Sequence, residues 1–150
     1  MGVFDKVMQE RHPAPESVTL TPRQAFAAIV VGGLNADGRV APEESVRVNE
    51  IFNSARLFRH PSAEPVQAIL DRVVELFRVH GTEAVVALAA KALPAELRAP
   101  AFTVAVDLVL ADGEASVEER KFIDALQELL QIPDEDAIKI VDVIIVKNSV

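Results

Sequence analysis

Residues 36–44 read ADGRVAPEE, and residues 111–119 read ADGEASVEE, 75 positions later. Each copy follows a long apolar run and precedes a polar, charged one. A glycine after such a run is typical of a helix end, and a serine or acidic cluster is typical of the next helix start. The doubled motif therefore predicts two helix-turn-helix units and an internal duplication of the chain.

The similarity between the two halves extends beyond this motif. A shift of 75 residues pairs Ile29 with Val104 and Val48 with Ile123. Apolar residues match apolar residues, so the two copies are expected to pack in the same way. We therefore predict a single compact all-α domain in which the two units are related by an internal pseudo-twofold repeat.

Capping signals and apolar spacing place about seven helices along the chain. Thr21 and Gln24 match a capping box, and Pro22 suits the first turn that follows. No segment alternates apolar and polar residues for long enough to predict a sheet. The expected helices begin at Thr21, Ala41 to Pro42, Ser62, Thr82, near Ala95, at Ser116 and at Asp134 to Glu135, and the last ends near Lys147.

The second of these helices is predicted from the spacing of its apolar residues. Val48, Ile51, Phe52 and Ala55 form a stripe at positions i, i+3, i+4 and i+7, which is the pattern of a helix face turned to a core. We expect this helix to extend through Leu57.

In three other helices, prolines or β-branched residues work against the helical prediction. Pro65 is expected within the first turn of the third helix, where proline is tolerated, and Pro100 is expected to break or kink the fifth. Residues 138–146 are rich in valine and isoleucine, which favour a strand by propensity alone. Their helical spacing and the acidic start before them favour a helix instead.

Three residues inside apolar helices are unusual there and need a physical explanation. Gly32 and Gly33 lie in mid-helix, where glycine costs stability, so we predict a tight helix crossing there. Asp107 stands opposite Gly32 in the repeat alignment, and a buried carboxylate must be paired or hydrogen-bonded. We expect Asp107 to face the edge of the apolar stripe and to reach water or an arginine, with a ligand or partner role as the alternative.

Length and composition are those of one ordinary globular domain of 150 residues. Residues 1–20 are predicted to form an N-terminal arm or short helix, and residues 21–150 the helical domain. The absence of cysteine excludes disulfides and thiolate chemistry, and three histidines argue against a histidine-rich zinc site. No apolar run approaches the roughly 20 residues of a membrane span, and no signal peptide is visible, so a cytoplasmic location is expected.

The net charge of −8 is concentrated in the second half of the chain. Residues 1–81 hold 9 basic and 10 acidic side chains, whereas residues 82–150 hold 6 basic and 13 acidic ones. An acidic chain repels nucleic acid phosphates, so no nucleic acid partner is expected. The C-terminal half favours cations or basic partners.

The two motifs bring carboxylates to two turns, and carboxylate oxygens are the ligands that Ca²⁺ and Mg²⁺ prefer. If the pseudo-twofold brings the turns together, these side chains converge on one cation. An EF-hand is not supported, because Val117 and Ile123 occupy the positions that need glycine and glutamate. The candidate metal ligands are Asp37, Glu43, Glu44, Asp112, Glu118 and Glu119.

The competing interpretation of the same residues is helix capping. Gly38 and Gly113 suit the left-handed conformation just past a helix end. Ser116 and Glu119 match a capping box at the next helix start, whereas Ala41 replaces the serine in the first copy. Both interpretations stay open at this point.

With both copies of the Ala-Asp-Gly turn and its glutamate pair in view, the chain resembles the tellurite-resistance TerB-like family over roughly residues 20–147. Glu44 and Glu119 hold the acidic position seven residues after each aspartate. The resemblance implies an all-helical, non-enzymatic, cytoplasmic domain linked to tellurite and chemical stress, for which metal binding through acidic residues has been proposed. Related domains in a DnaJ-like membrane co-chaperone and in complexes near the inner membrane imply that a peripheral membrane complex is open to this chain.

Three functions compete at this stage. The first is a scaffold or sensor domain in a stress response, tuned by a divalent cation such as Ca²⁺, Mg²⁺ or Zn²⁺. The second is a metal-independent protein-interaction module, which uses Val141, Ile144 and Ile145 of the last helix to dimerise or to dock on a protein partner. The third is an enzyme, and it is disfavoured because no catalytic triad, phosphate loop or histidine metal motif is visible.

Overall fold

All regular secondary structure in the described part of the chain is helical. The computed structural model describes residues 2–4, 17–36, 50–52, 55–59, 64–111 and 113–149, and no strand occurs among them. The all-α prediction is therefore confirmed, with six α-helices and one 3₁₀ helix given bounds in these ranges. The elements are α2 (Pro22–Leu34), η2 (Arg56–Phe58), α4 (Val66–His80), α5 (Thr82–Ala92), α6 (Ala95–Val109), α7 (Val117–Leu129) and α8 (Asp134–Lys147).

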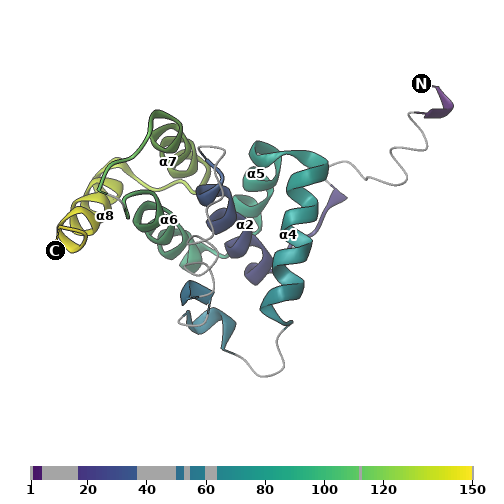
Figure 1. The fold of residues 1–150 in the computed structure, drawn as a ribbon, viewed down its shortest axis with the longest axis horizontal. Coiled ribbons are helices and arrows are strands. Elements are labelled where there is room, and N and C mark those ends of the chain that lie inside the picture. The colour runs from purple at the N-terminus through teal and green to yellow at the C-terminus, as the bar shows by residue number, and fades with distance from the viewer. Residues whose placement is uncertain are drawn as a thin grey trace.

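Helix α2 is the centre of this compact domain. Figure 1 shows it between α4 and α5 on one side and α6, α7 and α8 on the other, and its most extensive contacts are with α5, α6 and α4. Residues 25–30 of α2 are all buried. Ala25, Ala27 and Ala28 have small side chains, which allow neighbouring helices to approach from several directions. The core thus surrounds α2.

The start of α2 forms as predicted. The Gln24 N–H donates to Thr21 Oγ1 at 3.2 Å, and the Thr21 N–H donates to Gln24 Oε1 at 3.1 Å. Pro22 occupies the first turn of α2. Proline lacks a backbone N–H, but an N–H in the first turn would have no acceptor within the helix, so nothing is lost. This capping box satisfies two of the amides that a helix start leaves unpaired.

The glycine pair of α2 lies at a tight helix crossing, as predicted. A Cβ atom at Gly32 would lie 2.8 Å from Val86 Cγ2 of α5 and 3.4 Å from Phe122 Cε2 of α7. A Cβ atom at Gly33 would lie 3.4 Å from Phe122 Cε1. Only glycine at position 32 lets α5 come this close without displacement.

The structure corrects three details of the predicted helices. Helix α6 continues unbroken from Ala95 to Val109, so Pro100 does not break it, and the kink, which is the other expectation, stays a prediction. Pro65 is the N-cap of α4 and stands before its first turn. Ala55 has an extended backbone, and Leu57 belongs to the 3₁₀ helix, so neither extends the second helix.

Helix α8 is a helix despite its β-branched residues, as predicted. Ala137 and Ile144 are buried on its inner side, and Ile140 and Val141 pack against the core. Burial of this helical stripe outweighs the small difference in intrinsic propensity. Pro133 precedes the first residue, and Asp134, Glu135 and Asp136 complement the helix dipole in the first turn.

Several predictions fall outside the described residues. They concern Ser62 as a cap, the start of the second helix near Pro42 and most of the first copy of the motif, residues 37–44. The pseudo-twofold relation between the two halves therefore stays a prediction. Among the described helices, none is both long and apolar enough to cross a membrane.

Candidate functional site

The second copy of the motif lies at the junction between α6 and α7. The Leu110 N–H donates to Val106 O at 2.9 Å, and the Gly113 N–H donates to Leu110 O at 3.0 Å. Gly113 has φ = +89°, a conformation that side chains disfavour. The prediction that this glycine takes a positive φ just past a helix end is confirmed.

The start of α7 is a full capping box. The Glu119 N–H donates to Ser116 Oγ at 3.1 Å, and the Ser116 N–H donates to Glu119 Oε1 at 2.9 Å. Glu119 therefore has a structural role that its position in the motif explains without a ligand. Glu118 lies beside it in the first turn, with an exposed side chain.

The structure describes two of the six candidate metal ligands. Glu118 and Glu119 share the first turn of α7, whereas Asp37, Glu43, Glu44 and Asp112 lie outside the described residues. Among residues 2–4, 17–36, 50–52, 55–59, 64–111 and 113–149, no three histidine, aspartate or glutamate side chains are close enough to hold a metal ion. Convergence of the two acidic turns stays a prediction.

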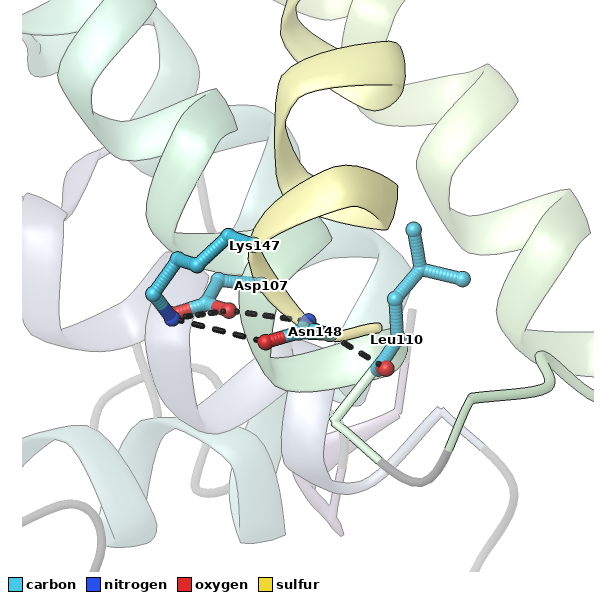
Figure 2. Close-up of polar contacts among 4 residues, drawn as sticks. All are labelled: Asp107, Leu110, Lys147 and Asn148. Carbon is cyan, nitrogen blue, oxygen red and sulfur yellow. Dashed lines mark hydrogen bonds and ion pairs between the residues drawn. The ribbon is translucent and has the colours of Figure 1, made fainter. Parts of the chain in front are cut away.

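A polar cluster ties the ends of α6 and α8 together beside this turn, as Figure 2 shows. Lys147 Nζ lies 3.0 and 3.1 Å from the two carboxylate oxygens of Asp107. Asn148, the C-cap of α8, donates from Nδ2 to Asp107 Oδ1 at 3.2 Å and to Leu110 O at 3.3 Å. The Leu110 carbonyl thus accepts both from α8 and from Gly113, which fixes the end of α6 directly before residue 112.

This cluster provides partners for the carboxylate of Asp107. This carboxylate is paired, as a half-buried charge should be, and Lys147 and Asn148 are its partners in this cluster. A contact of Asp107 with water or an arginine stays a prediction. Lys147 and Asn148 lie 40 and 41 residues away in the chain. No local pattern in the sequence links them to Asp107, so sequence reasoning missed both.

The apolar face predicted on the last helix is also corrected. Ile144 is buried at 6% exposure and is not free to meet a partner, whereas Val141 is partly buried against the core. Ile145 is 50% exposed and remains on the surface. The large apolar side chains that α8 presents to solvent are Ile138, Val143, Ile145 and Val146.

Together, the fold and the site define a small all-helical domain with an Ala-Asp-Gly turn closed by helix caps and followed by an acidic first turn. The family model of tellurite resistance protein TerB matches residues 23–142, well over half of the chain. The chain therefore belongs to the TerB family. Searches of curated proteins and of solved structures found no match to it.

Proposed function

We propose that this chain is a non-enzymatic scaffold or sensor domain of the response to tellurite or related chemical stress. The observation that carries the proposal is the TerB match, because it spans both Ala-Asp-Gly motifs and the helices between them. The proposed setting is the cytoplasm, with protein partners, a second copy of the chain included, and without nucleic acid. A complex at the membrane surface is compatible with this role.

The proposed ligand is a divalent cation, Ca²⁺, Mg²⁺ or Zn²⁺, held by the acidic turns. Asp37, Glu43 and Glu44 of the first copy would act with the carboxylates of the second copy. Two features of the described residues support a site beside residue 112. The turn is closed on both sides by hydrogen bonds at Leu110 and Ser116, and the exposed Glu118 carboxylate adjoins it. A pre-organised turn binds an ion at a lower entropic cost.

The test is a titration of the protein with Ca²⁺, Mg²⁺, Mn²⁺ and Zn²⁺, followed by amide NMR shifts. We expect saturable shifts of residues in both turns, and loss of those shifts in Asp37→Asn and Asp112→Asn. Asp142→Asn on α8 is the matched control, since Asp142 is exposed and lies on another element. Turns that stay unshifted at millimolar concentrations of all four ions would remove the cation from the proposal.

A second candidate function is a metal-independent interaction module. The observation that favours it is the outer surface of α8, where Val143 and Val146 are 66% and 71% exposed. Exposed apolar groups that gather on one element can mark a protein interface. The partner would be a second copy of the chain or a docking protein.

Light scattering in the presence of EDTA distinguishes this candidate from the first. If α8 is the interaction surface, the chain forms a dimer without metal. Val146→Lys should then shift the monomer–dimer equilibrium toward the monomer. Val74→Lys on α4 is the control, because Val74 is a comparably exposed valine on another helix. A protein that stays monomeric at all concentrations, with or without metal, would contradict self-association through α8.

A further inference from the structure

A groove of about 680 Å³ opens beside the second motif, between the end of α2, the first turns of α5 and one face of α7. Its floor is apolar, with Val86 and Leu126 buried and Phe122 half-buried. The lining residues are Asn35, Ala36, Thr82, Glu83, Val86, Ala87, Glu118, Lys121, Phe122, Ala125, Leu126, Glu128 and Leu129.

The groove is long enough to hold a helix of about three turns. Its α7 wall runs from Glu118 to Leu129, about 16 Å at 1.5 Å per residue. Ala125 and Leu129 on this wall are exposed, so an apolar strip of α7 is left uncovered by the described chain. An amphipathic helix of about three turns matches such a strip, because its apolar side chains recur along one face.

The rim of the groove is acidic on both walls. Glu83 stands on α5, Glu118 and Glu128 stand on α7, and Lys121 is the single basic residue among the described residues of the lining. No described residue forms a salt bridge with any of these four side chains. Three carboxylates against one ammonium favour an occupant that carries positive charge.

The end of α2 adds to this preference. Asn35 and Ala36, which follow α2, line the groove, and the last turn of α2 has no basic residue. A helix C-terminus carries partial negative charge and favours a nearby cation. A lysine or arginine of the occupant would supply that missing charge.

We propose that this groove binds an amphipathic helix of a protein partner whose apolar stripe is flanked by lysine or arginine. The apolar stripe lies along Phe122, Ala125 and Leu129, and the basic side chains reach Glu83 and Glu128. The proposal concerns a surface separate from the outer face of α8. It does not depend on a bound cation, so binding measured in EDTA tests it independently of the proposed metal site.

The test uses a fluorescein-labelled 18-residue peptide with leucines at helical spacing i, i+3, i+4 and i+7 and lysines at the remaining positions. A matched peptide replaces every lysine with glutamate. We expect saturable binding of the lysine peptide by fluorescence anisotropy in EDTA, with NMR shifts in residues 82–87 and 118–129. The glutamate peptide should bind at least tenfold more weakly.

Two variants of the protein address the groove directly. Ala125→Trp fills the apolar strip from an exposed position and should weaken the lysine peptide at least tenfold. The double variant Glu83→Gln, Glu128→Gln removes rim charge and should weaken it several-fold. Ala68→Trp on the exposed face of α4 and Asp142→Asn on α8 are the matched controls and should leave binding unchanged. Circular dichroism melting curves verify that Ala125→Trp still folds.

Three results would overturn the proposal. The first is equal binding of the lysine and glutamate peptides. The second is a folded Ala125→Trp protein that binds like the wild type. The third is a peptide of residues 1–12 of this chain that displaces the lysine peptide from the groove, since the chain itself would then be the occupant.

Discussion

Gly32 lies where the central helix passes close to α5 and α7. A Cβ atom there would approach Val86 of α5 to 2.8 Å, closer than real side chains come. The neighbouring Gly33 faces only Phe122 of α7, at 3.4 Å. A single hydrogen in place of a methyl group at residue 32 therefore sets the distance between α2 and α5.

This contact predicts opposite effects for two similar substitutions. Alanine is favoured over glycine in a helix by about 1 kcal/mol, whereas overpacking a core costs about 1–3 kcal/mol. We expect Gly32→Ala to destabilise the protein by about 1 kcal/mol, and Gly33→Ala to be neutral or stabilising by up to about 1 kcal/mol. Urea unfolding of both variants measures the difference. A Gly32→Ala protein as stable as the wild type would show that α5 can shift at no cost.

At the scale of elements, Pro100 is the one proline beyond the first turn of a described helix. Proline lacks the N–H that would donate to the carbonyl of Glu96, and its ring crowds that carbonyl. Helix α6 nevertheless continues, because Ala101, Phe102, Ala105 and Val106 on its inner face are buried. Burial of a whole face outweighs the loss of one hydrogen bond, which the local sequence signal at Pro100 does not reveal.

Replacement of this proline should therefore stabilise the protein. Interior proline costs a helix about 3 kcal/mol, and part of that cost is offset by the lower entropy of the unfolded chain. Because residue 100 is exposed, we expect Pro100→Ala to raise the unfolding free energy by about 1–2 kcal/mol. Denaturant unfolding measures the change, and Ala99→Gly in the same exposed turn is the control, with a loss of about 1 kcal/mol. A destabilised Pro100→Ala protein would mean that a bend at this residue is needed for packing.

At the scale of the molecule, the core is unevenly distributed. Helix α2 packs against four helices, whereas α8 makes its most extensive contacts with α6 and has only Ala137 and Ile144 buried. The C-terminal end of α8 is held by Lys147 and Asn148 on Asp107 (Figure 2). Helix α8 is therefore expected to detach from the described fold more easily than α2.

Hydrogen exchange can measure this gradient. We expect amides of α8 to exchange through a partial opening whose free energy lies below that of global unfolding, and amides of residues 25–30 to exchange only by global unfolding. Asn148→Ala should lower the opening free energy of α8 by about 1 kcal/mol and leave α2 unchanged. Equal protection of both helices in native-state exchange would contradict this order.

Helix identities and boundaries could be read from the sequence wherever their causes are local. Thr21 with Gln24 and Ser116 with Glu119 interact across three residues, so the caps that start α2 and α7 are visible in the chain itself. The helical spacing in residues 138–146 identified α8 for the same reason, since a 3.6-residue period is local. Membership of the TerB family also follows from the chain, because the match rests on sequence.

Contacts between distant segments depended on tertiary packing. The glycines at 32 and 33 indicated a crossing, but only the fold identified Val86 and Phe122 as the residues that need the space. Asp107 required a partner, and the fold supplied Lys147 from 40 residues away. The acidic groove likewise combines α2, α5 and α7. Local sequence shows which groups need a neighbour, whereas the choice of neighbour is made by the packing of helices that are far apart in the chain.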